Sequence, residues 1–264
     1  MQPVLQKTAR SGFFRGGIPL VITLYTFLSL WNLPSISPAC LELETWLRMV
    51  KLPYTTVIIT ANELELAPKG KIPFVDYQGQ LIGDATLIIE MLKQAEGIDL
   101  DTNLTPRERA ISLAFRRMLK ENTYWGTIHI RYDLEENWQG YRDVLAHAFF
   151  PEAPLEASKP FVEEFRQTIL SQFHGHGMGR HNYEEISQLI CADFQALSDL
   201  LADKPFFLGN QPTTLDATAY AFIGNFIKAP YASSIVDYIL RQPNLCQHYE
   251  RMTQQFFSER LLNP

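Results

Sequence analysis

The chain has 264 residues, which at about 150 residues per domain allows two modest domains or one large one. Apolar residues make up 46% of the chain and charged residues 20%, proportions that exclude a disordered or collagen-like protein. The net charge of −6 comes without a compact basic stripe, so we expect no nucleic-acid partner.

The first segment, residues 1–17, is basic and is predicted to be a loose arm. No charged residue lies between Arg15 and Glu42, which is the outline of a signal peptide or a membrane anchor. The apolar run 18–33 is shorter than the ~20 residues that a bilayer-spanning helix needs, and a proline and several polar residues interrupt it. We therefore predict a buried strand over 18–27 and no stable membrane span.

Helix and strand signals then alternate up to residue 97. Ser37 before a proline is typical of a helix start, a Gln-Gly pair is typical of a hairpin turn, and Asp84 is placed to cap a further helix. The predicted elements are a helix over 38–51, a strand over 54–60, a hairpin of 72–77 with 80–82, and a helix over 85–95. Residues 18–97 are thus predicted to form a βαββα domain.

The rest of the chain carries mainly helical signals. Residues 98–106 turn polar and lose apolar periodicity, and we predict a linker there. The helical domain is predicted over 107–264, with helices at 107–131, 161–173, 186–202, 214–227, 235–240 and 245–257, and one extended piece at 205–208. The segment 133–184 gives mixed signals, so apart from the helix at 161–173 no structure is predicted for it. Thr213 and Asp216 are predicted to form a structural capping box.

Three sequence strings add a family resemblance to this organisation. A βαββα half, a helical half and an Ile-Pro pair opening the hairpin are similar to the glutathione transferase superfamily. The strings are residues 34–48 (PSISPACLELETWLR), 121–125 (ENTYW) and 174–181 (HGHGMGRH), and they resemble the failed axon connections branch, related to the metaxins. The resemblance implies an N-terminal thioredoxin-like domain followed by an all-helical C-terminal domain, glutathione as co-substrate, and a homodimer.

Two residues in the first turn of the 38–51 helix are candidates for catalysis. The resemblance implies that the Ser37 hydroxyl donates to the sulfur of glutathione and lowers its pKa, whereas on cap geometry alone Ser37 is an N-cap. Cys40 lies three residues on, where the helix dipole can lower a thiol pKa. Because Ser37 replaces a first cysteine, a CxxC redox cycle is excluded. A mixed disulfide on Cys40 and a buried core role remain open.

The hairpin supplies further candidates for binding glutathione. The resemblance implies that the Ile72-Pro73 bond is cis, which turns the backbone of Ile72 toward the cysteinyl part of the ligand. Without the resemblance, a proline at the start of an edge strand is an adequate account. Lys71 is predicted either to meet a carboxylate of the tripeptide or to be solvated.

The start of the 85–95 helix is where the resemblance places the γ-glutamyl end of glutathione. Asp84 fits the acidic residue expected there. Ala85 departs from the usual serine and removes one hydroxyl, a loss of about 1 kcal/mol. Thr86 is a candidate to supply the missing contact.

Aromatic and basic residues of the helical half are candidates for a second-substrate pocket. Tyr124, Trp125, Ile128 and Tyr132 share one side of a long helix and are predicted either to wall an apolar pocket or to belong to the core. Arg180 and His181 are predicted either to face a bound anion or to lie in a solvated, glycine-rich flexible loop. No metal site is predicted, because the histidines of 174–181 would not be held in place.

These observations lead to one main functional hypothesis and two alternatives. The main hypothesis is a transferase that joins the glutathione thiolate to a small apolar electrophile. The first alternative is a non-catalytic, metaxin-like adaptor, motivated by Ala85, and the second is glutathione-dependent thiol transfer at Cys40. Three cysteines without a CxxC pair favour a reducing compartment, so a cytoplasmic location is expected.

Overall fold

A four-stranded sheet forms the first half of the protein in the computed structural model, which describes residues 14–15, 18–19 and 22–260. Across the sheet the strands are β4 (Thr55–Ile58), β3 (Ile22–Thr26), β5 (Phe74–Tyr77) and β6 (Gln80–Gly83). β3 is parallel to β4 and antiparallel to β5, and β5 is antiparallel to β6. β1 (Phe14–Arg15) and β2 (Ile18–Pro19) pair separately. Most of the predicted arm 1–17 lies outside the described residues.

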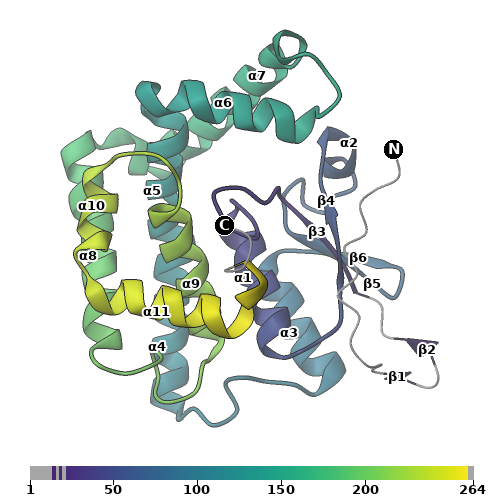
Figure 1. The fold of residues 1–264 in the computed structure, drawn as a ribbon, viewed down its shortest axis with the longest axis vertical. Helices are drawn as coiled ribbons and strands as arrows, with labels where there is room; N and C mark the ends of the chain where they lie inside the picture. Colours follow the sequence, from purple (N-terminus) through teal and green to yellow (C-terminus); the bar gives the residue numbers. More distant parts are fainter. Residues whose placement is uncertain (1–13, 16–17, 20–21, 261–264) are drawn as a thin grey trace.

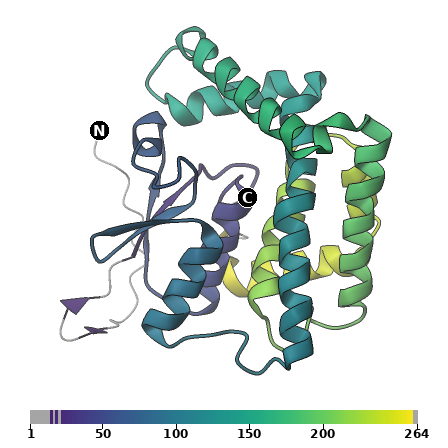
Figure 2. The ribbon, with the colours of Figure 1, turned by 180° about the vertical axis from the view of Figure 1, so that it is seen from behind.

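Helices α1 (Pro38–Met49), α2 (Ala61–Leu64) and α3 (Ala85–Glu96) complete this half. α1 and α3 lie between the sheet and the helices of the second half (Figures 1 and 2). The predicted βαββα order is confirmed, with α2 as an additional short helix. The strand predicted over 18–27 is confirmed for residues 22–26.

The turn and the helix starts that short sequence patterns predicted are present in the structure. Ser37 is the N-cap of α1. Gln78 and Gly79 have φ values of 56° and 83°, and positive values at both positions are what a tight two-residue hairpin turn requires. Asp84 Oδ1 accepts a hydrogen bond of 3.0 Å from the backbone N–H of Leu87 and thereby caps α3.

The second half is helical, as predicted. Its α-helices are α4 (Pro106–Arg117), α5 (Tyr124–Ile128), α6 (Glu135–Phe149), α7 (Leu155–His176), α8 (Tyr183–Leu201), α9 (Thr214–Ile227), α10 (Ser234–Leu240) and α11 (Pro243–Phe256). Two π-helical segments adjoin α5: η1 (Met118–Thr123) joins α4 to α5, and η2 (His129–Asp133) extends α5 up to Leu134, whose extended backbone separates it from α6. Short 3-10 turns are η3 (Met178–Arg180) and η4 (Ser258–Arg260). Within residues 22–260, no helix has the length and apolar character needed to cross a membrane.

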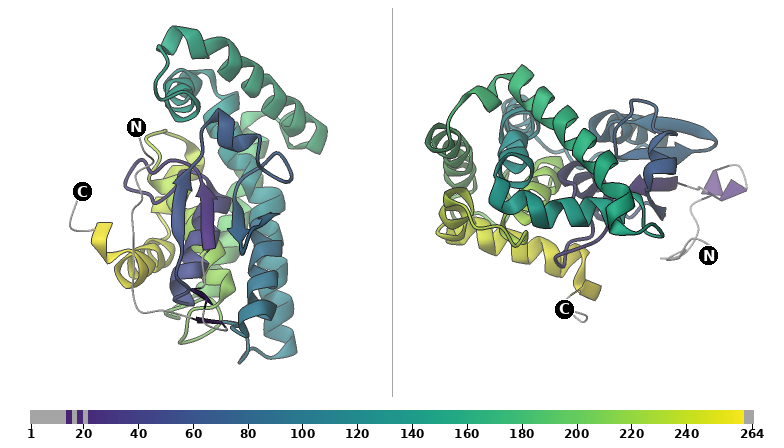
Figure 3. Two further views of the ribbon diagram at one scale, coloured as in Figure 1. Left: turned by 90° about the vertical axis from the view of Figure 1, so that its right-hand side faces the viewer. Right: turned by 90° about the horizontal axis from the view of Figure 1, so that it is seen from above.

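The segment 133–184 differs most from the sequence expectation. It forms the two neighbouring helices α6 and α7, which extend over the end of the sheet near α2 (Figures 1 and 3). The expected flexible loop over 174–181 is wrong, because α7 continues to His176 and η3 follows almost at once. Gly177, with a φ of 106°, ends α7 as a left-handed C-terminal residue. The backbone of Gly179 packs so closely on Phe173 that a Cβ there would lie 2.7 Å from the ring.

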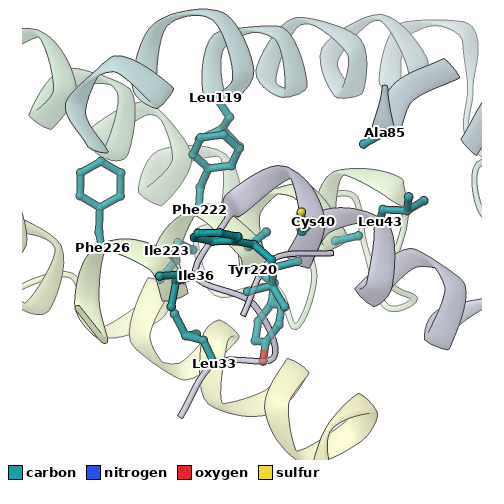
Figure 4. Close-up of a cluster of buried hydrophobic side chains, with 14 of the residues drawn as sticks. Leu33, Ile36, Cys40, Leu43, Ala85, Leu119, Tyr220, Phe222, Ile223 and Phe226 are labelled. Atoms are coloured by element: carbon teal, nitrogen blue, oxygen red, sulfur yellow. The ribbon is translucent and has the colours of Figure 1, made fainter. Parts of the chain in front are cut away.

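The two halves share one buried core along α1 and α9. Figure 4 shows Ile36 of the first half beside Phe222 and Ile223 of α9. Cys40 and Leu43 of α1 belong to the same buried cluster. Gly224 of α9 leaves room for Tyr249 of α11 and for Leu33 of the first half, since a Cβ there would lie 2.6 and 3.2 Å from these side chains. The orientation of the two halves is therefore maintained by a continuous hydrophobic interface.

The predicted capping box at the start of α9 is confirmed. The backbone N–H and the hydroxyl of Thr213 donate to Asp216 Oδ2 at 2.8 and 2.9 Å. Asp216 Oδ1 accepts the N–H of Phe207 at 3.0 Å and lies 2.9 Å from His248 Nε2. Every oxygen of this buried carboxylate is thus satisfied, which supports a structural role.

Candidate functional site

A cavity of about 480 Å³ lies between the two halves of the molecule. One end is polar and is bordered by the start of α1, the β5 hairpin and the start of α3. The other end is apolar and is bordered by α6 and α7. Of the predicted site residues, the cavity is lined by Ser37, Lys71, Ile72, Pro73, Asp84, Ala85, Tyr124, Ile128 and Tyr132.

Ser37 lies at the polar end, at the positive end of the α1 dipole. Its Oγ accepts the backbone N–H of Cys40 at 3.4 Å, and its own N–H donates to Ser35 Oγ at 3.3 Å. A hydroxyl that accepts in this way still has its proton to donate. Ser37 can therefore cap the helix and also donate a hydrogen bond to an anion in the cavity.

Arg131 lies in the same cavity, and the sequence analysis missed it. Its buried guanidinium donates to the carbonyl of Ile36 at 2.7 Å and to the backbone and side-chain oxygens of Asn225 at 2.7 and 3.0 Å. It also lies over the rings of Trp31 and Tyr141, 5.3 and 5.6 Å from their centroids. Within the described residues no carboxylate forms an ion pair with it. This buried positive charge, beside the residue that precedes Ser37, favours an anion in the cavity.

The hairpin residues expected at the polar end are there. The Ile72-Pro73 peptide bond is cis, as the resemblance implied. Lys71 Nζ donates to Gln172 Oε1 of α7 at 3.3 Å, so it reaches across the cavity mouth. Asp84 adopts a φ of 83°, unusual for a residue with a side chain, and such backbone strain is concentrated at functional sites.

Thr86 does not line the cavity, contrary to its expected role as a substitute for the missing serine. Its hydroxyl accepts a hydrogen bond of 2.7 Å from Lys120 Nζ of η1. Lys120 also forms an ion pair of 2.9 Å with Glu42 of α1, and both Lys120 and Glu42 line the cavity. No local sequence pattern indicates this pair, because its members are 78 positions apart.

Cys40 is fully buried among hydrophobic side chains and does not line the cavity (Figure 4). Burial raises the pKa of the thiol, although hydrogen bonds from Ser37 and neighbouring groups work in the opposite direction. The helix dipole was expected to lower this pKa, and that expectation is wrong because desolvation of the thiolate is the larger effect. The core role left open for Cys40 is the one that the structure shows.

The aromatic stripe on the long helix is only partly in the cavity. Trp125 faces elsewhere, with its ring stacked on Phe173 and His176 at centroid distances of 5.9 and 4.7 Å. Successive residues of a helix point in different directions, so Trp125 does not line the cavity, although its ring contacts that of Tyr124 edge to face at 5.2 Å. Burial raises the pKa of Tyr132 well above its ordinary value and that of Tyr124 to about 12, so both hydroxyls are protonated at neutral pH.

Arg180 and His181 also lie away from the cavity, contrary to the anion-binding expectation. Arg180 Nε donates to the carbonyl of His174 at 3.2 Å, and His181 Nδ1 lies 3.2 Å from Glu185 Oε2. Both side chains are engaged around the end of α7 and the start of α8. Within the described residues no group of three His, Cys, Asp or Glu side chains is arranged for a metal ion.

The apolar end is formed by the α6–α7 pair, of which the sequence predicted only the helix at 161–173, within α7. Its lining side chains include Leu145 and Phe149 of α6 and Phe165 and Ile169 of α7. Phe149 and Phe165 pack edge to face at 5.2 Å between centroids. The cavity therefore has an apolar wall opposite a polar end that favours an anion. It could hold two ligands together, one charged and one apolar.

Comparisons with known protein families agree with this architecture. A profile described as the glutathione S-transferase N-terminal domain matches residues 38–138, and one described as the glutathione S-transferase C-terminal domain matches residues 190–252. The isoprene-epoxide–glutathione S-transferase of Rhodococcus sp. (strain AD45) is 32% identical over 240 residues, covering 89% of this chain and 99% of that protein.

Two further relatives have names that mention no transferase. Failed axon connections of Drosophila melanogaster is 34% identical over 250 residues, covering 90% of this chain but 59% of that protein. Metaxin-2 of Homo sapiens is 22% identical, covering 86% and 84%. Among solved structures, a beta-etherase from Sphingobium sp. strain SYK-6 has a TM-score of 0.62 at 16% identity, covering 90% of this chain and 99% of that chain, which shows a shared fold.

Proposed function

Because the chain belongs to the glutathione S-transferase family, we propose that it binds glutathione and transfers the thiolate to a small apolar electrophile. The observation that carries this proposal is the single cavity that joins Ser37, the cis Ile72-Pro73 backbone and Asp84 to an aromatic wall. The polar thiol and the apolar electrophile would both bind inside this cavity. Binding would hold them in the orientation needed for reaction, so the reaction would no longer depend on an encounter in solution.

The polar end supports activation of the thiol. The Ser37 hydroxyl would donate to the sulfur, and the α1 dipole and the Arg131 charge would both favour the thiolate over the thiol. The two polar backbone groups of Ile72, turned by the cis bond, would pair with the cysteinyl unit of glutathione. Ser37 then acts as a hydrogen-bond donor and forms no covalent bond.

An epoxide is the first substrate to test, because the Rhodococcus relative is named for isoprene epoxide. Attack by the thiolate would form a carbon–sulfur bond and break one carbon–oxygen bond of the ring. The oxygen would take a proton from the hydroxyl of Tyr132 or Tyr141, both of which line the cavity, and solvent would return it. Replacing either tyrosine by Phe should slow epoxide opening more than transfer to an aryl halide, which needs no proton.

The test begins with binding and ends with turnover. Glutathione at millimolar concentration is expected to raise the melting temperature by mass action. Incubation with isoprene epoxide should then yield a glutathione adduct, detected by mass spectrometry. Absence of any thermal shift at millimolar glutathione would contradict the proposal at its first step.

A second candidate is a binding module without turnover, favoured by Ala85 in place of the serine expected at the γ-glutamyl site. It predicts a stable protein partner, recovered by pull-down, whose retention survives Ser37→Ala. It also predicts no adduct with several electrophiles.

Glutathione-dependent thiol transfer at Cys40 is not proposed further, because that thiol is buried and its pKa is raised.

A cytoplasmic location and a homodimer complete the proposal. Exposed leucines occur on β6, α3 and α4, at Leu81, Leu87 and Leu113. Covering them would remove apolar surface from water. Light scattering of the full chain would give the mass of the species in solution, and a monomer at micromolar concentration would contradict the dimer.

A further inference from the structure

A charged lysine from the helical half reaches into the glutathione-binding half. Lys120 Nζ donates to Glu42 Oε2 at 2.9 Å and to Thr86 Oγ1 at 2.7 Å. Glu42 has no exposed surface, and its other oxygen accepts the Thr218 hydroxyl at 2.7 Å. An ammonium group has three donors. Two are used in these hydrogen bonds, and the side chain lines the cavity, so the third is left for a ligand.

The ammonium group of Lys120, a residue of η1, lies at the first turn of α3. Ala85, where the expected serine hydroxyl is missing, belongs to the same turn. Thr86, the partner of Lys120, is the second residue of that helix, and Asp84 and Ala85 line the same part of the cavity. Amide groups in the first turn of a helix have no acceptor within the helix. The local environment therefore combines a cation, free backbone donors and, from Asp84 and Glu121, carboxylates.

This combination matches an α-amino acid group, which carries one ammonium and one carboxylate. We propose that Lys120 binds the α-carboxylate of the γ-glutamyl end of glutathione and takes the place of the hydroxyl absent at Ala85. The inference rests on the proposed function and names the residue that selects this end of the ligand. The ammonium end would pair with Asp84 or Glu121, so the ligand would bridge the two halves.

The Glu42–Lys120 pair allows a test in which two substitutions should change the affinity for glutathione in opposite directions. Glu42 neutralises part of the Lys120 charge in the free protein and competes with a ligand carboxylate for the same ammonium. Glu42→Gln keeps the size of the side chain and an acceptor for Thr218, and it removes the competing charge. Glutathione should therefore bind more tightly to Glu42→Gln and more weakly to Lys120→Met. A pair with only a structural role predicts no such opposite change.

The experiment measures the Kd of the intact protein for three thiols by calorimetry. Lys120→Met should weaken glutathione and γ-glutamylcysteine about tenfold, the loss of one charged hydrogen bond, and leave cysteinylglycine unchanged. Glu42→Gln should tighten the first two by about threefold. Lys71→Met is the matched control in the hairpin part of the polar end, and it should weaken glutathione but not γ-glutamylcysteine.

The remaining outcomes are separable. If Lys120→Met binds all three thiols as the native protein does, or weakens them all equally, the assignment of Lys120 is wrong. If the native protein itself binds no glutathione, the proposed function fails instead. Should Lys120→Met fold poorly because Glu42 is left as an unpaired buried charge, the double variant E42Q/K120M removes both charges and must still lose about tenfold for γ-glutamyl thiols.

Discussion

The two ends of the cavity are constructed in different ways. The polar end uses backbone features of short segments: the N-cap of α1, a cis peptide bond before β5, and a strained residue that caps α3. The apolar end uses side chains of the two helices α6 and α7, which become neighbours only when the chain folds. Glutathione would thus be recognised by a fixed backbone, whereas the second substrate would be selected by side chains, which can be substituted without changing that backbone.

Arg131 connects the two ends, and its loss should have the largest effect. Arg131→Met removes three hydrogen bonds and leaves buried carbonyl oxygens without donors, so we expect a loss of about 3 kcal/mol in unfolding free energy. The pKa of bound glutathione should rise, which thiolate absorbance in the ultraviolet would measure. Arg166→Met is the control, because that buried guanidinium has carboxylate partners and should leave the thiol pKa unaltered.

Ser37→Ala should act on the polar end alone. The loss of a hydrogen bond to a charged sulfur corresponds to a decrease in kcat/KM of about tenfold to a hundredfold. Because the thiol pKa would be less strongly lowered, the rising limb of the pH–rate profile should move to higher pH. Thr45→Ala removes another buried hydroxyl of α1, one that donates to the carbonyl of Leu41 and does not line the cavity, and it should leave that profile in place. Equal shifts in both variants would contradict the role of Ser37.

Phe165→Ala should act on the apolar end alone. We expect the KM for the electrophile to rise about fivefold while the KM for glutathione stays constant, because only apolar contact area is lost. Phe161 is on the same helix, is 38% exposed and does not line the cavity, so Phe161→Ala is the matched control. Steady-state kinetics with each substrate varied in turn would separate the two ends.

Cys40→Ala should have the smallest effect on activity. The buried thiol packs in the core, so about 1 kcal/mol of stability is lost while kcat/KM is unchanged. In the native protein, an alkylating reagent should label Cys191 and Cys246, which are partly exposed, before Cys40. Rapid labelling of Cys40 with loss of turnover would reverse its assignment to the core.

Sequence reasoning succeeded where a signal and its structural answer lie within a few residues. The N-caps at Ser37 and Asp84, the Gln78-Gly79 turn and the Thr213–Asp216 box each satisfy backbone groups up to three positions away. The order of elements followed from apolar periodicity, and the string resemblance added the family and the cis bond.

It failed where neighbours distant in sequence decide the outcome. The π-helical turns of η1 and η2 carry the cavity residues Lys120 and Arg131, and no local pattern distinguishes them from ordinary helix. The same limit explains Trp125, which followed the aromatic periodicity but faces Phe173. It also explains the α6–α7 pair, whose helices are stabilised by aromatic contacts with each other.

The amino-acid sequence by itself determined the two-part architecture, the caps and turns, and the family to which the chain belongs, because each depends on short-range periodicity or on residue strings. Only the tertiary structure decided which of these residues share the cavity. It buried Cys40, and it set the Arg131 guanidinium against Ile36, 95 positions away. The physical reason is that desolvation and charge pairing depend on distance in space, which a linear sequence does not contain.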